Sequence, residues 1–444
     1  MARFLFASIP VPAHTTNPLP IASRLVERGH EVVWYAGAAF HERIAATGAR
    51  PVPYGAAHDF SEGDLFDHFP QYAGRGGARV IGAVFAEIFV GHAPQRVADL
   101  RRLLAEHPSD AVLCDGLMYG VGMVHELGGP PWATFGDGPL GYPEPDTPPF
   151  GPGLLPMAGP AGRLRNRLVA AVARRAVFAG AQRAHDGIRA DLGLPAGGDV
   201  LDASFSPFLH LQASTPAFEY PRPSLPPHVH WIGALRPDPV RWAEPAWWPE
   251  VLASPRPVVH VTQGSLRADM TELVAPALRA LADEDVLVVV TSGAASPAEV
   301  EAAHGGPLPA NARVVPFVPY DELLSRASAF VTNGGWSGLT VALHHGVPIV
   351  QAGTTEEKSE NGARVQWSGA GLRLGTTRPS PDAVRDAVRR VLHEPSFGAA
   401  AGRVRAEMVT HDAAREAADL LLELARNRRP VVRTGDAQKS SVTR

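Results

Sequence analysis

The chain has 444 residues, of which 45% are hydrophobic and 19% charged, and its formal net charge is −4. This length exceeds what one hydrophobic core commonly supports, so two domains are expected. The small net charge gives no footprint for nucleic acid or an anionic membrane. No run approaches the roughly 18 apolar residues of a spanning helix, so no stable membrane insertion is expected. The single cysteine, Cys114, excludes an intrachain disulfide framework and favours a cytoplasmic protein.

The first half alternates short apolar runs with amphipathic stretches. Strands are expected at residues 4–9, 31–35, 110–114 and 131–135, and helices at 18–28 and, as one long element, 80–104. Alternation of strands with helices indicates a parallel sheet covered on both faces. The Pro/Gly-rich stretch 138–160 is too long for an ordinary connection and is typical of a binding loop or lid.

The same pattern restarts in the second half. Strands are expected at 257–263, 285–291, 312–315, 329–332 and 348–351, with a helix at 272–281 and a last helix at 412–426 that Asp412 would cap. Proline-dense chain separates the halves. The expected division is an N-terminal domain over 1–233, a linker over 234–256, a C-terminal domain over 257–411, a helix over 412–427 that crosses back, and a disordered polar tail over 428–444.

Several motifs recur together along this chain. They are Pro12-Ala-His-Thr-Thr-Asn-Pro18, Arg28-Gly-His-Glu-Val32, Val259-His-Val-Thr-Gln-Gly-Ser265, Val314-Val-Pro-Phe-Val-Pro-Tyr320, Val331-Thr-Asn-Gly-Gly-Trp-Ser-Gly338, Ala342-Leu-His-His-Gly-Val-Pro348 and Glu356-Glu-Lys-Ser-Glu-Asn361. Together, over about residues 3 to 427, they resemble the family 1 glycosyltransferases, which decorate antibiotics, macrolides, phenolics and terpenoids. The resemblance implies an α/β GT-B fold: two Rossmann-like domains with parallel sheets facing across a cleft.

The sequence departs from the family pattern at four positions. Asn333 stands where a phosphate-contacting histidine is usual, and Val341 replaces an acidic residue that grips the ribose. Glu357-Lys358 replaces the usual acidic-Gln pair near the sugar, and Tyr320 replaces a glutamine. These changes leave the nucleotide (UDP, dTDP or GDP) and the sugar open.

Two residues are candidates for the chemistry. His14 follows the first strand, at the end where α/β sheets bind ligands, and a neutral histidine can take a proton from an acceptor hydroxyl near pH 7. Asp115 follows the strand at 110–114, and the resemblance implies that it orients His14. The alternatives are a structural or surface histidine, one of 18 in the chain, and a turn aspartate that caps a helix.

The donor-site residues follow from the resemblance. The turn from Asn333 to Gly338 would place backbone N–H groups and a helix N-terminus at a diphosphate, or be a tight glycine turn only. Phe317 would stack on the nucleotide base, and backbone groups of Val318 would bind the edge of that base; alternatively, Phe317 would be a core phenylalanine. The remaining expected contacts are Ser265, Gly334, Gly335, Ser337, Glu357, Lys358 and Asn361. The alternative for the charged ones is the first turn of a surface helix.

Acceptor contacts are expected from Tyr142 and Phe150 in the 138–160 loop and from Phe85 and Phe89. No Cys/His metal-ligand spacing is present, and no Asp-x-Asp that would hold Mg²⁺ on a diphosphate, so we expect no metal and no cofactor beyond a nucleoside-diphosphate sugar as co-substrate.

The motifs thus predict an inverting, metal-independent hexosyltransferase of secondary metabolism, acting as monomer or homodimer on a small apolar acceptor. Two alternatives stay open: a sugar-nucleotide 2-epimerase, which would need no acceptor pocket, and a non-catalytic sugar-nucleotide-binding helper of a partner enzyme. O-, N- and C-transfer are not distinguished.

Overall fold

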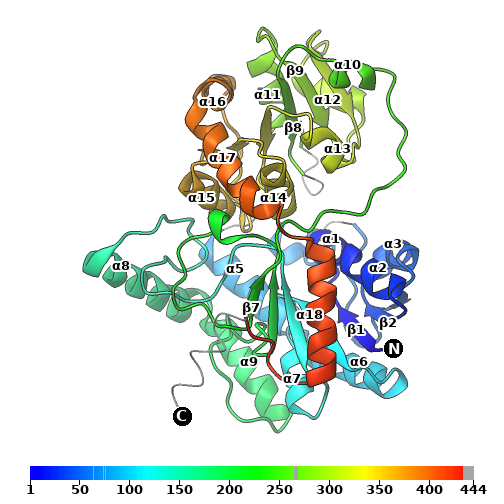
Figure 1. The fold of residues 1–444 in the computed structure, drawn as a ribbon. Helices are drawn as coiled ribbons and strands as arrows, with labels where there is room; N and C mark the ends of the chain where they lie inside the picture. The colour runs from blue at the N-terminus through cyan, green and yellow to red at the C-terminus, as the bar shows by residue number, and fades with distance from the viewer. Residues whose placement is uncertain (64, 74, 76, 265–268, 434–444) are drawn as a thin grey trace.

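A computed structural model describes residues 1–433 apart from 64, 74, 76 and 265–268, and shows two parallel sheets, each covered by helices (Figure 1). The first sheet has the order β3-β2-β1-β4-β5-β6-β7. Its strands are β1 Arg3–Ala7, β2 Glu31–Tyr35, β3 Arg50–Val52, β4 Ala111–Asp115, β5 Trp132–Gly136, β6 Leu209–Gln212 and β7 Val229–Trp231. The strand order reverses between β1 and β4, and ligands of open α/β sheets bind at the carboxyl ends beside such a reversal.

Both faces of the first sheet are buried, which explains its nearly continuous apolar strands. Phe4 and Phe6 of β1 pack on one face with helices α2 (Leu19–Glu27) and α18 (Ala413–Asn427). Leu5 and Ala7 pack on the other with α6 (Ala93–Glu106) and α7 (Val121–Glu126).

The second sheet has the order β10-β9-β8-β11-β12-β13. Helices α11 (Val274–Leu281) and α16 (Pro381–His393) cover one face, and α14 (Trp336–His344) and α17 (Pro395–Met408) the other. Its strands are β8 Val258–Thr262, β9 Leu287–Thr291, β10 Ala312–Val315, β11 Ala329–Thr332, β12 Ile349–Gln351 and β13 Gly371–Arg373.

The other helices lie in connections or at the edges. They are α1 Pro12–Thr16, α3 His41–Ala46, α4 Leu65–His68, α5 Ala78–Val84, α8 Gly159–Val172, α9 Ala179–Asp191, α10 Trp248–Leu252, α12 Pro297–His304, α13 Tyr320–Leu324 and α15 Lys358–Ser368. Short 3₁₀ helices lie at Ala38–Phe40, Pro70–Tyr72 and Pro216–Phe218, and π-helical turns at Phe85–Val90 and Ala173–Val177. No helix among the described residues is long and apolar enough to cross a bilayer.

The expectation of one continuous helix over 80–104 is wrong, because the helical segment is interrupted. The chain there forms α5, the π-helical turn 85–90 and α6. Gly91 and His92 separate the last two, and Pro94 lies in the first turn of α6, where a missing N–H costs nothing.

The linker expected over 234–256 is also not wholly a linker. Within it, α10 packs Trp248 and Val251 against Val258 and Leu287 of the second sheet. The chain runs as a long strand-free connection from the first sheet to this helix (Figure 1). The density of proline in this segment led us to expect no helix. Pro249 lies in the first turn of α10, however, where proline is compatible with a helix.

Helix α18 lies against the first sheet, where Ala417, Leu421 and Leu424 are buried in the same cluster as Phe4. The Asp412 side chain accepts from the N–H of Arg415 and caps the helix.

The tail expected to be disordered over residues 428–444 is ordered in its first part, so that expectation is wrong for residues 428–433. The N–H of Val431 donates to the carbonyl of Phe208 at 2.9 Å, and Val431 is buried. Residues 434–444 lie outside the described residues.

A buried charge network joins the two halves of the molecule. Arg364 of α15 lies 3.0 Å from Glu219 and 2.6 Å from Glu360. The Glu360 carboxylate also accepts the N–H groups of Gly151 and Gly153 at 2.9 and 2.6 Å. These two glycines belong to the long loop after β5. The loop thus lies against the second half. The carboxylates of Glu219 and Glu360 and the guanidinium of Arg364 all have hydrogen-bond partners, which buried charges require.

Candidate active site

His14 lies beside the reversal in strand order of the first sheet. After β1 ends at Ala7, the chain turns through Pro10 into the short helix α1, which carries His14. The His14 Nδ1 lies 3.2 Å from Oδ1 of Asp115, the last residue of β4. The His14 side chain keeps 21% of its surface exposed, whereas Asp115 is buried. The structure therefore brings together the two residues expected to carry the chemistry.

Asp115 is held from two sides by backbone N–H groups. Its Oδ2 accepts from Ile9 and its Oδ1 from Leu117, both at 2.8 Å. These two bonds fix the plane of the carboxylate. The His14 Nδ1–H is not aimed well enough for a hydrogen bond of good geometry, so its contact with Asp115 is an ion pair. Asp115 can therefore orient the ring and stabilise a positive charge on it.

A second carboxylate, Asp137, faces the same imidazole and was missed by the sequence analysis. Its Oδ1 lies 4.0 Å from His14 Nδ1, and its Oδ2 accepts from Asn17 Nδ2 at 3.3 Å. Asp137 directly follows β5, as Asp115 ends β4. The reasoning that selected Asp115, a carboxylate at the carboxyl end of a central strand, could have found Asp137 as well.

The charges around His14 decide its protonation. Burial disfavours the imidazolium, but the carboxylates of Asp137 and Asp115, with a smaller contribution from Glu357, outweigh it and raise the pKa of His14 to about 9. Burial in turn raises the pKa of Asp137, an effect that the His14 charge opposes. We expected a neutral imidazole near pH 7. With these carboxylates around it, a His14 pKa of about 9 means that the imidazole of the free enzyme is mostly protonated at pH 7, so that expectation is wrong.

The donor-site turn connects β11 to α14. Gly334 has φ of 97°, and a Cβ there would meet Gln351 at 2.7 Å, so this position needs glycine. Gly335 is the N-cap of α14, and Ser337 lies in its first turn. Gly338 serves packing, because a Cβ there would lie 3.1 Å from the ring of Tyr320. A helix N-terminus preceded by this turn can receive an anion.

Buried amides hold this turn in place. Asn361 is fully buried and donates from Nδ2 to the carbonyl of Gly334 at 2.7 Å. Gln351, which the sequence analysis missed, donates from Nε2 to the carbonyls of Asn333 and Gly353 at 3.0 and 2.9 Å. The Nδ2 of Asn333 itself donates to the carbonyl of Gln263 at the end of β8. Asn361 thus supports the turn with its amide nitrogen.

Other expected donor contacts fall at the same edge of the second sheet. Asn333 and Lys358 line one small hollow with Gln263, Gly353 and Thr355. The Lys358 ammonium pairs with Glu356, while Glu357 is the residue whose charge reaches His14 across the two halves. Glu356 has φ of 50°, unusual for a residue with a side chain, and it marks a tightly constrained loop.

Phe317 and Val318 have opposite surroundings. The Phe317 side chain is 58% exposed, so the alternative that it is a core phenylalanine is wrong. Val318 is fully buried against Leu287 and Leu323. Ser265, expected to contact the donor, lies outside the described residues.

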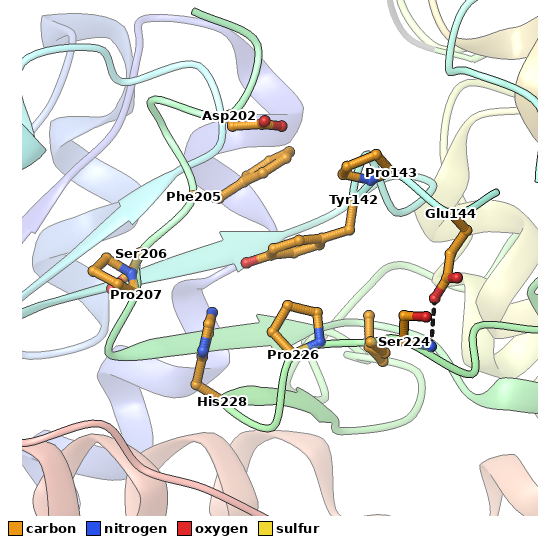
Figure 2. A pocket seen from close by; sticks show the side chains of 11 residues that line it. Tyr142, Pro143, Glu144, Asp202, Phe205, Ser206, Pro207, Ser224, Pro226 and His228 are labelled. Carbon is orange, nitrogen blue, oxygen red and sulfur yellow. Dashed lines mark hydrogen bonds between the residues drawn. The ribbon is translucent and has the colours of Figure 1, made fainter. Parts of the chain in front are cut away.

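The expected acceptor residues do not share one surface. Tyr142 stacks on Phe205, with ring centroids 4.8 Å apart, in a cavity of about 350 Å³ lined also by Glu144, Asp202 and His228 (Figure 2). Phe85 packs on Phe89 and on Phe178. Phe150 is exposed on the long loop. The cavity of Tyr142 contains none of the other three residues, nor His14.

Among the described residues, no group of three or more histidine, cysteine or acidic side chains is arranged to hold a metal ion. Cys114 is buried in β4, and burial raises the pKa of its thiol well above the ordinary value, which suits a packing residue.

Known proteins resemble this chain along nearly its whole length. The model of the erythromycin biosynthesis protein CIII-like C-terminal domain matches residues 276–424. The 4'-demethylrebeccamycin synthase of Lentzea aerocolonigenes is 44% identical over 423 residues, covering 95% of this chain and 99% of that protein. UDP-glycosyltransferase 2 of Phaeomoniella chlamydospora is 31% identical over 437 residues, covering 95% of each.

Solved structures show the same architecture. The calicheamicin glycosyltransferase CalG4 superposes with a TM-score of 0.73 at 20% identity, over 96% of this chain and 99% of that one. The glycosyltransferase VinC, solved in complex with dTDP, gives a TM-score of 0.68 at 25% identity, over 96% and 100%. The two parallel sheets are those of the GT-B fold, as expected. The chain is a glycosyltransferase and belongs to the family of natural-product glycosyltransferases with this fold.

Proposed function

We propose that this glycosyltransferase moves a sugar from a nucleoside-diphosphate sugar to a hydroxyl of a small apolar acceptor, with inversion and without a metal. The observation that carries the proposal is the ion pair between His14 and the buried Asp115 at the strand-order reversal of the first sheet. A base there, facing an anion-receiving turn on the second sheet, provides the two functions that the reaction requires.

In the proposed step, the acceptor oxygen attacks the anomeric carbon, its bond to the sugar forms, and the bond from that carbon to the diphosphate oxygen breaks. Neutral His14 takes the hydroxyl proton, and Asp115 stabilises the imidazolium that results. One direct displacement inverts the anomeric centre. N–H groups at the start of α14, with Asn333 and Lys358, receive the diphosphate charge.

Because the base must be neutral, and carboxylates raise the pKa of His14 to about 9, turnover should increase with pH up to that region. This dependence distinguishes proton abstraction by His14 from a purely structural role. The two alternatives, a sugar-nucleotide 2-epimerase and a non-catalytic sugar-nucleotide-binding helper, do not explain why a histidine with two carboxylates lies at the carboxyl edge of the first sheet.

The test is a donor and acceptor screen read by mass spectrometry. UDP and dTDP sugars are the first donors, since relatives are named UDP-glycosyltransferases and VinC was solved with dTDP. The acceptors include the aglycone of 4'-demethylrebeccamycin beside macrolides, flavonoids and terpenoids. A product heavier by one sugar is expected, and its anomeric configuration, read by NMR of the isolated product, should be opposite to that of the donor. Retained configuration, or epimerised donor without acceptor, would contradict the proposal.

A further inference from the structure

Helix α8 carries an uncovered apolar face. Leu164, Leu168 and Val172 are 58%, 59% and 63% exposed, although aliphatic side chains of this size are usually covered. They are four residues apart, so they lie in one row along the helix. The helix projects from the side of the first domain (Figure 1). A continuous exposed row of this kind marks a contact surface more than scattered single residues do.

The same segment is strongly basic. Residues 159–178 contain five arginines and no acidic residue, so the segment carries +5, whereas the whole chain carries −4. Arg163 pairs with Asp146 at 2.7 Å, and Arg174 pairs with Asp199. Arg167 and Arg175 are exposed and form no ion pair among the described residues. At 100° per residue, Arg163, Arg167 and Arg174 fall along one flank of the apolar row.

These two properties restrict what can cover the face. A second copy packed symmetrically would place the same arginine-rich helix opposite itself, and like charges would repel. An anionic bilayer surface satisfies both properties at once, because the apolar row enters the acyl boundary while flanking arginines meet lipid phosphates. The interaction is a surface one, because α8 has only 14 residues and three charged side chains in it.

We propose that α8 is a reversible membrane-surface anchor that lies in the plane of an anionic bilayer through Leu164, Leu168 and Val172, with arginines at the phosphates. The proposal is independent of the proposed chemistry at His14. It places the enzyme where apolar small molecules concentrate.

The test is co-sedimentation of the full chain with vesicles. Wild-type protein is expected to pellet with vesicles of phosphatidylcholine containing about one third phosphatidylglycerol, and far less with phosphatidylcholine alone. Binding should weaken at 0.5 M salt, since the arginine contribution is screened. The triple variant L164S/L168S/V172S is expected to lose at least about tenfold in partition coefficient, and R167E/R175E to lose binding to the anionic vesicles.

The matched control is V240S/L252S/V409S, which removes three aliphatic side chains that are about half exposed elsewhere on the described surface. It should bind like wild type, and all variants should keep the wild-type melting temperature. Absence of wild-type binding to anionic vesicles, or equal binding of the α8 and control variants, would overturn the proposal. So would a wild-type dimer that the α8 variants dissociate, since the face would then be covered by a second copy.

Discussion

The facing edges of the two sheets differ in the kind of side chain that they present. At the first sheet, His14 lies within 4.0 Å of two carboxylates, Asp115 and Asp137. At the second, the turn after β11 is held by the neutral amides of Gln351 and Asn361, which bond backbone carbonyls. One edge is organised around a titratable group and the other around a fixed backbone shape. A proton acceptor must change its protonation state during the reaction, so its pKa matters. An anion site needs N–H groups that are already held in the right positions.

The largest expected effect is at His14. We expect His14→Ala to lower turnover about a hundredfold or more, because the proton acceptor is lost. Folding should be retained, since Asp115 keeps its two backbone N–H bonds. Turnover and thermal unfolding, measured on this variant and on the exposed control His393→Ala, check both parts. A low melting temperature with little loss of turnover would indicate a structural histidine.

The next effect concerns the pH profile. The charge of Asp137 is the largest single interaction that raises the pKa of His14, which is about 9. Removing its charge in Asp137→Asn should lower that pKa, so the rising limb of the turnover profile should move to lower pH by roughly one unit. Turnover at pH 7 then becomes a larger fraction of its high-pH maximum.

Asp191→Asn, at an exposed position of α9, is the matched control for this charge removal. A limb that stays in place would remove Asp137 from the electrostatics of His14. A hundredfold fall of the high-pH maximum would instead identify Asp137 itself as the proton acceptor.

A smaller effect is expected on the second sheet. In Asn333→His the ring can approach a diphosphate bound at the turn from Asn333 to Gly338 and add partial charge. We expect nucleoside diphosphate to bind a few-fold to about tenfold more tightly, increasingly so toward pH 6, where histidine protonates. Calorimetric titration at two pH values, with Gln366→His on α15 as the control, measures this. Equal affinities for all three proteins would place the diphosphate elsewhere.

No effect is expected from chelation. If backbone N–H groups and side chains carry the leaving-group charge, EDTA should leave turnover unchanged. Assays with EDTA and after addition of Mg²⁺ or Mn²⁺ test this, and activity restored by either ion would contradict the proposal.

Periodicity predicted most of the central strands to within about two residues, because strands buried on both faces are short, apolar runs. It missed β3, β6, β7 and β13. The alternate residues of β6 are His210 and Gln212, buried polar side chains, and β13 has three residues beginning with Gly371. Such strands are recognisable only by the neighbours with which they pair.

Apolar runs and motifs were enough to predict the α/β class and the two halves. They also indicated His14, Asp115 and the 333–338 turn as the principal candidates, because each follows a predicted strand. The surroundings of these candidates depend on the tertiary fold. Asp137, Gln351 and Glu357 come from separate elements, and only folding places their charges and bonds on His14 or on the turn. The same holds for the 431–433 segment, which reads as polar tail but pairs with Phe208 and Pro227. Local composition reports propensity, whereas pKa and burial depend on neighbours distant in sequence.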